Sequence, residues 1–389
     1  MSDLYRSAIH ARASKLPPVP PTVYPGHTYG DEVEDDGDED AEMGDSLGSL
    51  PSEMGPPKFS SSRRQRTSNP SFAPISAAGY FEQATQVSVV TSGLDFRAYY
   101  TPPKFADGSV LVCHHGAGYS GLSFACFAKE VTRLSKGECG VLSFDCRGHG
   151  KTSRIGSQSS KDEDLSIQTL TNDLLNLLST IFPDPISAPT FLLVGHSLGG
   201  SVCVRACPLL QERKYRTTGV AVLDVVEEFT LEALPMMQSL LDARPEGFDS
   251  VEEAVEWHVK TNAIRNVDSA RVSIPSVVVQ NPRPTTRAPA YLWRTPLRST
   301  APYWTSWFTG LSSKFLSART ARLLVLAGTE RLDKELMIGQ MQGKFQLEVL
   351  TGVGHMIHED DPIRLAELLV EFWRRNERVL VGIKKVGDL

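Results

Sequence analysis

The sequence lacks a long apolar run and a secretory leader. No apolar run reaches the ~20 residues that a membrane-spanning helix needs, so we expect no membrane segment. Residues 1–6 do not have the charged-then-apolar order of a signal peptide. We therefore expect a soluble protein of the cytoplasm or the nucleus, which is not secreted and does not contact a membrane.

Cysteine is scarce as well, and its spacing carries no metal or disulfide pattern. None of the six cysteines belongs to a CxxC pair or to a cysteine–histidine cluster, so neither a zinc site nor a disulfide framework is indicated. We expect reduced thiols, as in intracellular proteins. The cysteines are Cys113, Cys126, Cys139, Cys146, Cys203 and Cys207.

Charge is unevenly distributed between the N-terminal segment and the rest. Of the formal charge of -6 over 389 residues, residues 1–70 carry -5, from 12 acidic and 7 basic side chains. The rest of the chain is almost neutral, so its net charge says little about its ligand. We expect no nucleic-acid partner.

The N-terminal segment, residues 1–75, is rich in proline, glycine, serine and charge. It has too few apolar residues to offset the entropy of ordering, and we expect a disordered tail. A proline-rich stretch (15–21), an acidic run (31–45) and a basic cluster (63–66) favour a solvated tail over a docking or nuclear-import motif. Residues 76–389 then form one domain, since 41% hydrophobic content allows a large core.

The domain alternates short apolar runs with segments of helical period. Residues 87–90 and 96–100 predict an antiparallel pair of strands. Apolar runs predict buried parallel strands, and an apolar stripe over residues 167–181 predicts an amphipathic crossover helix. The fold class is therefore α/β, with a mostly parallel sheet flanked by helices. The runs lie at 110–113, 141–144, 191–194, 220–223, 323–326 and 347–350.

The alternation stops at about residues 225–320. Helix-like segments, a loop rich in proline and arginine (281–298) and aromatic residues at 303–308 take its place. We expect this insertion to be a helical lid over the carboxyl ends of the strands. The aromatic residues fit the interior of a lid and a docking face about equally well.

The run at 191–194 leads into Gly195-His-Ser-Leu-Gly-Gly200 and a helix-compatible stretch. A strand, GxSxG and a helix in this order form the nucleophile elbow of the α/β-hydrolase fold, with Ser197 as the nucleophile. The loop His115-Gly-Ala-Gly118 after an earlier strand matches an oxyanion loop. We expect the backbone amides of Ala117 and Leu198 to form the oxyanion hole.

The general base is selected from nine histidines by chain order. In this fold the base follows the last strand, which favours His355, preceded by Gly352 and Gly354. His358 is the rival, closer to the closing helix that Asp361 and Pro362 can begin. His149 and His196 come before any candidate acid. Two aspartates could be that acid, Asp224 after the run at 220–223 and Asp333 after the run at 323–326, and spacing alone slightly favours Asp333.

Beyond the elbow, segments at 223–227, 263–273, 304–312 and 331–345 resemble those of the protein phosphatase methylesterases. These enzymes remove the methyl ester from the C-terminal leucine of the type 2A phosphatase catalytic subunit. The likeness spans about residues 79–374; Ala117, where the family tends to have glycine, and the loop 281–298 depart from it. The resemblance implies that Asp224, rather than Asp333, is the triad acid.

The resemblance further implies a carboxyl methylesterase that works through an acyl-enzyme on Ser197, without metal or cofactor. Its partners would be the methylated tail of the phosphatase catalytic subunit and its holoenzymes. We also hypothesise that the free enzyme has little activity until its partner orders the lid or the triad. A general carboxylesterase or lipase, and a phosphatase-binding scaffold without turnover, remain as alternatives.

Overall fold

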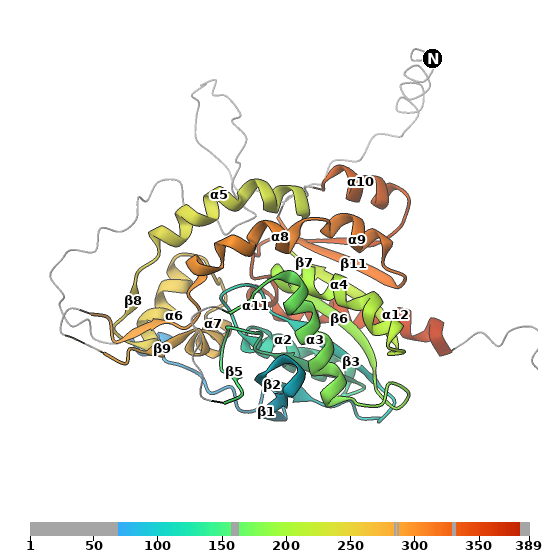
Figure 1. The fold of residues 1–389 in the computed structure, drawn as a ribbon, viewed down its shortest axis with the longest axis horizontal. Helices are drawn as coiled ribbons and strands as arrows, with labels where there is room; N and C mark the ends of the chain where they lie inside the picture. Colours follow the sequence, from blue (N-terminus) through green and yellow to red (C-terminus); the bar gives the residue numbers. More distant parts are fainter. Residues whose placement is uncertain (1–68, 157–162, 284, 286–287, 329–331, 382–389) are drawn as a thin grey trace, which may run out of the picture. The chain divides into compact units, whose positions relative to one another are not determined.

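The computed structural model describes residues 69–156, 163–283, 285, 288–328 and 332–381. Its main feature is a nine-stranded sheet in the order β1-β2-β4-β3-β6-β7-β11-β12, with β5 paired to β2 (Figure 1). The strands are β1 (Gln83–Val89), β2 (Leu94–Thr101), β3 (Ser109–His114), β4 (Cys139–Phe144), β5 (Ser153–Arg154), β6 (Thr190–His196), β7 (Thr217–Leu223), β11 (Ala321–Ala327) and β12 (Gln346–Leu350).

The sheet is mixed at one edge and parallel elsewhere. β1 and β2 form the predicted antiparallel pair, and β2 is also antiparallel to β4. The pairs from β4 through β3, β6, β7 and β11 to β12 are all parallel. Each predicted run lies within one of these strands, because continuous apolar runs suit strands that are covered on both faces. The predicted α/β architecture is confirmed.

Helices cover both faces of the sheet. α3 (Ile167–Ile181) packs beside α4 (Leu198–Glu212), and their apolar side chains share one core with alternate residues of the central strands. α2 (Ala125–Ser135) packs beside α12 (Pro362–Val381) in a second core, formed with the intervening residues. α3 has the predicted bounds, and the Ser166 side chain caps it by accepting a hydrogen bond from Thr169 N. α12 begins at Pro362, as predicted.

The insertion between β7 and β11 is mostly helical. Its helices are α5 (Glu227–Ala243), α6 (Val251–Lys260), α7 (Val267–Ser273), α8 (Trp304–Phe308) and α9 (Leu311–Ser317). It also contains a small antiparallel sheet that the sequence did not predict, made of β8 (Gly247–Phe248), β10 (Tyr291–Trp293) and β9 (Val278–Gln280). α5 packs on α8, and both α8 and α9 contact α4 (Figure 1).

The three aromatic residues of α8 pack into the core of the domain. Trp304, Trp307 and Phe308 are 5%, 1% and 3% exposed and belong to the core that α3 and α4 share. Trp307 Nε1 donates a hydrogen bond to Leu165 O at 2.7 Å. These side chains therefore hold α8 onto the body of the domain and are not available as a docking face.

Shorter helical segments complete the described chain. These are the 3-10 turns η2 (Pro70–Phe72), η3 (Val90–Ser92), η4 (Gly121–Phe124), η5 (Ile274–Ser276) and η6 (Leu297–Tyr303), and the helices α10 (Lys334–Met341) and α11 (Ile357–Asp360). In the parts of the chain that the structure describes, no helix is both long enough and apolar enough to cross a membrane. All six cysteines are free thiols.

The predicted boundary between tail and domain lies next to residues that already contact the domain. Ile75 N donates a hydrogen bond to Arg271 O at 3.0 Å, and Arg271 Nε donates to Ala73 O at 2.7 Å. Residues 1–68, with the proline-rich, acidic and basic stretches, lie outside the described residues. The division into a disordered tail and a domain stays a prediction.

Candidate active site

Ser197 lies in the sharp turn between β6 and α4. Its φ of 51° and ψ of -118° are unusual for a residue with a side chain, and its amide donates to Leu223 O at 3.0 Å. The turn leaves no room beside it: a Cβ on Gly195 would lie 2.2 Å from Gly199 O, and one on Gly199 would lie 2.1 Å from His114 O. The glycines of the motif are therefore required for the strand and the helix to approach this closely.

His355 and Asp224 are joined by a hydrogen bond. Nδ1 of His355 lies 2.7 Å from Oδ2 of Asp224, whose other oxygen accepts a hydrogen bond from Ala327 N at 2.8 Å. The Asp224 side chain is 4% exposed and the His355 side chain 24% exposed. A buried carboxylate thus contacts Nδ1 of a partly exposed imidazole, an arrangement suited to a general base.

The elbow contacts His355 through His196, the residue that precedes Ser197. The ring of His196 is 4.6 Å from that of His355, and His196 Nε2 is 2.8 Å from His355 O, which fixes the imidazole as a donor to that carbonyl. In the described part of the chain, Ser197 Oγ makes no hydrogen bond to His355. The elbow and the loop that carries His355 are therefore adjacent through His196.

The predicted oxyanion loop, residues 115–118, lies against the elbow. A Cβ on Gly116 would be 2.7 Å from His196 Nδ1 and 3.4 Å from Cβ of Ser197. Leu198 is the first residue of α4, where backbone amides have no partner within the helix. Ala117 and Leu198 therefore come from two segments that meet at Ser197.

The rejected candidates have other partners. Asp333 caps α10: its carboxylate accepts hydrogen bonds from Leu336 N, at 2.9 Å, and from the Ser312 hydroxyl. His358 is fully buried and stacks on Phe124, with ring centroids 4.2 Å apart. The spacing preference for Asp333 is therefore not matched by the geometry, since it is Asp224 that contacts His355.

Burial dominates the electrostatics around His355. It lowers the pKa of His196 well below the ordinary value, with a further contribution from the charges of His355 and His358. Burial lowers the pKa of His358 to about 3 and raises the pKa of Glu359 well above the ordinary value. Burial thus favours the neutral form of each of these three groups.

The loop that carries His355 is held by a second carboxylate. Asp360 Oδ2 accepts a hydrogen bond from Gly354 N at 2.6 Å, and its Oδ1 accepts one from Arg265 N, in the insertion, at 2.7 Å. Sequence reasoning missed this contact. The short spacing from Gly354 to Asp360 was its only signal.

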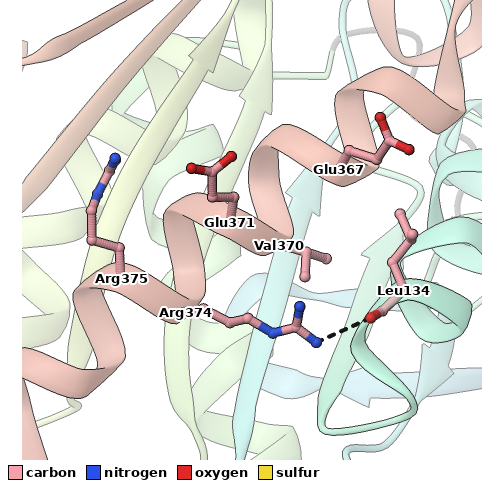
Figure 2. A pocket seen from close by; sticks show the side chains of 6 residues that line it. All are labelled: Leu134, Glu367, Val370, Glu371, Arg374 and Arg375. Atoms are coloured by element: carbon pink, nitrogen blue, oxygen red, sulfur yellow. Dashed lines mark hydrogen bonds between the residues drawn. The ribbon is translucent and has the colours of Figure 1, made fainter.

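Elsewhere, a surface hollow lies between α12 and the end of α2. It is lined by Leu134, Glu367, Val370, Glu371, Arg374 and Arg375, and Arg374 Nη2 donates to Leu134 O at 3.0 Å (Figure 2). None of the residues around Ser197 lines it. Among the residues described, no cluster of three or more histidine, cysteine, aspartate or glutamate side chains is arranged to hold a metal ion.

Comparison with known proteins shows the family to which the chain belongs. The model of the alpha/beta hydrolase family matches residues 111–368. Protein phosphatase methylesterase 1 of Cryptococcus neoformans var. neoformans is 45% identical, over 100% of this chain and 96% of that protein. The protein of the same name from Aspergillus fumigatus is 41% identical, over 100% of this chain and 93% of the relative. The chain belongs to the protein phosphatase methylesterase family. A further relative, from Schizosaccharomyces pombe, is 41% identical over 79% of this chain and 87% of that protein.

Solved structures support the fold of this methylesterase-family chain. E-2-(acetamidomethylene)succinate hydrolase superposes with a TM-score of 0.57 at 17% identity, covering 75% of this chain and 99% of the other. The peroxisomal alpha-beta-hydrolase Lpx1 of Saccharomyces cerevisiae gives 0.54 at 16% identity, covering 76% and 85%. At such identities the likeness extends to the fold alone.

Membership of the methylesterase family confirms the predicted family and class, a serine hydrolase of carboxyl esters. The catalytic roles of Ser197, His355 and Asp224, and the oxyanion roles of Ala117 and Leu198, stay predictions that the geometry supports.

Proposed function

We propose that the protein removes the methyl ester from the C-terminal leucine of the type 2A protein phosphatase catalytic subunit. The observation that carries this proposal is the 2.7 Å hydrogen bond between Asp224 and His355 beside a serine in an elbow turn. Family membership supplies the substrate class, because relatives that match this chain over its whole length are named protein phosphatase methylesterase 1.

The first half of the reaction transfers the acyl group to the enzyme. Ser197 Oγ attacks the carbonyl carbon of the leucine methyl ester while His355 Nε2 takes the hydroxyl proton. Asp224 keeps the Nδ1 proton in place and stabilises the imidazolium that forms. As the tetrahedral intermediate collapses, the bond to the methoxy oxygen breaks, and His355 returns the proton to that oxygen, so methanol leaves.

The second half returns the enzyme. His355 removes a proton from water, the hydroxide attacks the acyl carbon, and the ester bond to Ser197 breaks as Oγ takes the proton back. The amides of Ala117 and Leu198 stabilise the negative oxygen in both halves, which typically contributes about a hundred- to a thousandfold in rate per donor.

A folded partner requires more contact than one peptide tail, and the insertion is our candidate for this contact. It provides Arg265, whose amide reaches Asp360 beside the His355 loop. Partner contact with the insertion would thus be transmitted through Asp360 to the loop that carries His355. The holoenzymes that carry the phosphatase would be recognised in the same way.

The test uses intact type 2A phosphatase methylated on its C-terminal leucine. Loss of the ester is followed by mass spectrometry with the wild type and with Ser197→Ala, for which we expect at least a thousandfold lower rate. A short methylated tail peptide, assayed in parallel, reports whether the partner is needed for full activity. Demethylation by neither protein, with binding retained, would support a scaffold instead. Wild-type turnover of simple acyl esters without binding of the phosphatase would support a general esterase.

A further inference from the structure

A second histidine contacts the oxyanion loop directly. His149 is 2% exposed and follows β4 in the loop 145–150. Its Nε2 lies 2.9 Å from Gly118 N, the last amide of the oxyanion loop. An amide nitrogen can only donate, so Nε2 must be the acceptor, and the ring must be neutral with its proton on Nδ1.

The environment of the ring enforces this tautomer. Nδ1 lies 2.8 Å from Arg147 O and 3.2 Å from Cys146 Sγ, and the carbonyl oxygen can only accept. Burial lowers the pKa of His149 to about 4, so the neutral ring persists throughout the neutral pH range. His149 is therefore a fixed acceptor aimed at one amide.

The loop that carries His149 is itself rigidly anchored. Arg147 forms a two-pronged ion pair with Asp173 of α3, at 2.7 and 2.8 Å, and its Nη2 also donates to Ser92 O at 3.0 Å. Paired hydrogen bonds of this kind fix orientation as well as position. The acceptor that Gly118 meets is thus held by the body of the domain.

The same two loops are joined at a second point. His115 Nε2 accepts a hydrogen bond from Cys146 N at 3.0 Å, and His115 Nδ1 donates to Gly116 O at 2.8 Å. The oxyanion loop is thereby tied to the loop 145–150 at both of its ends, by His115 at one and by Gly118 at the other.

The insertion covers this junction. Thr295 Oγ1 donates to Gly148 O at 3.0 Å. Gly118 has a φ of 84°, and a Cβ there would lie 2.6 Å from Cδ1 of Leu297. Gly118 therefore donates its amide to His149 and packs against Leu297, and a side chain at this position would collide with Leu297.

We propose that His149 is a positioning residue of the reaction: by accepting the Gly118 amide proton, it holds the oxyanion loop so that the amide of Ala117 faces the acyl oxygen on Ser197. The Gly118 amide, being engaged, does not bind the oxyanion itself. This inference rests on the proposed function, since it presupposes attack by Ser197.

A fluorophosphonate probe tests the inference without the phosphatase. Ser197 Oγ attacks phosphorus, fluoride leaves, His355 takes the hydroxyl proton, and the phosphonyl oxygen occupies the oxyanion position. We expect His149→Leu to slow labelling by about 10- to 100-fold, a little less than loss of a whole oxyanion donor. The probe concentration at half-saturation should change by less than about threefold, because binding of the neutral probe precedes the need for the amide.

Two variants separate positioning from stability. His149→Gln, whose amide oxygen can accept from Gly118, should label within about threefold of the wild type, whereas the shorter His149→Asn should be as slow as His149→Leu. His258→Leu removes a buried histidine from α6, in the insertion, and should label like the wild type. If His149→Leu does not fold, the Gln and Asn pair carries the same comparison.

The outcomes are distinguishable. Labelling of His149→Leu at the wild-type rate, or equal slowing by the Gln and Asn variants, would overturn the positioning role. Labelling of Ser197→Ala at the wild-type rate would instead reject the nucleophile, and with it the proposed function.

Discussion

Strands β7 and β11 are neighbours in the sheet, and each is followed by an aspartate. Asp224 follows β7 directly and has a φ of 52°. Its carboxylate accepts hydrogen bonds from His355 Nδ1 and from Ala327 N. Asp333 lies further along the chain after β11 and caps α10 while accepting from Ser312. An aspartate after a core strand thus contacts the candidate base in the loop after β7, whereas the aspartate in the loop after β11 caps a helix.

The difference lies in where each carboxylate can reach. Asp224 occupies a strained backbone conformation that turns its side chain to the loop after β12. Asp333 has an extended backbone, with a φ of -63° and a ψ of 166°, the usual geometry of an N-cap residue. The two aspartates therefore differ both in backbone conformation and in the partners that their carboxylates reach.

The largest expected effect comes from removing the charge of Asp224, in the loop after β7. Asp224→Asn should lower kcat for demethylation by roughly ten-thousandfold, because the amide stabilises the wrong tautomer of His355. Asp333→Asn should stay within about threefold of the wild type, since asparagine is also a good N-cap residue. Steady-state kinetics of both variants, with circular dichroism to verify folding, checks this contrast. Equal losses in both variants would erase the distinction between the loops.

The dependence of stability on acid pH tests the protonation of His358, near Asp224 and His355. His358 has a folded-state pKa of about 3, and the unfolded chain takes up the proton at about 6.5. Its neutral state therefore contributes stability above about pH 6.5 that is lost as the pH falls toward 3. His358→Leu should reduce the loss between pH 6.5 and 4.5 by up to about 2.7 kcal/mol, at 1.36 kcal/mol per pH unit.

Urea unfolding at the two pH values measures this loss. Both ring nitrogens of His358 lack a hydrogen-bond partner in the described chain, so leucine removes no hydrogen bond. Ser312→Ala, at a residue that contacts Asp333, should retain the wild-type pH dependence. An unchanged pH dependence in His358→Leu would mean that the histidine is not neutral in the folded protein.

Changes at Asp333, in the loop after β11, are expected to affect stability without affecting turnover. Asp333→Ala removes the cap of α10 and should lower the free energy of unfolding by about 2 kcal/mol, with kcat within about threefold. Denaturant unfolding and the demethylation assay measure the two quantities. A loss of kcat beyond about a hundredfold in a folded variant would return Asp333 to the active site.

The smallest effect is the coupling between Asp333 and Ser312. In a double-mutant cycle of Ser312→Ala and Asp333→Ala, we expect a coupling energy of about 0.5–1 kcal/mol, because their hydrogen bond is buried. Strict additivity of the two changes would show that this hydrogen bond contributes nothing to stability.

The sequence predicted the parts of the fold that have a strong period. The runs at 191–194 and 220–223 lie within β6 and β7, and α3 has its predicted bounds, because burial on both faces or on one stripe leaves a continuous signal. The small sheet in the insertion was missed. Its strands have two or three residues, too short for an alternating pattern.

The candidate site divides in the same way. Ser197 and His355 follow from local motifs and chain order, whereas spacing favoured Asp333 over Asp224, and only the family resemblance corrected it. The contact between His149 and Gly118 joins the loops after the neighbouring strands β4 and β3, and no local sequence pattern encodes this side-chain contact. Tertiary contacts of this kind have to be observed in the structure.

The most direct measurement is the capture of the acyl group on Ser197. Wild-type protein is mixed with methylated phosphatase, quenched in acid within milliseconds, digested, and analysed by mass spectrometry. Our account predicts that the peptide containing Ser197 gains the C-terminal fragment of the phosphatase, attached through the leucine carbonyl, with methanol released. Consumption of the ester with the fragment on another residue would contradict it.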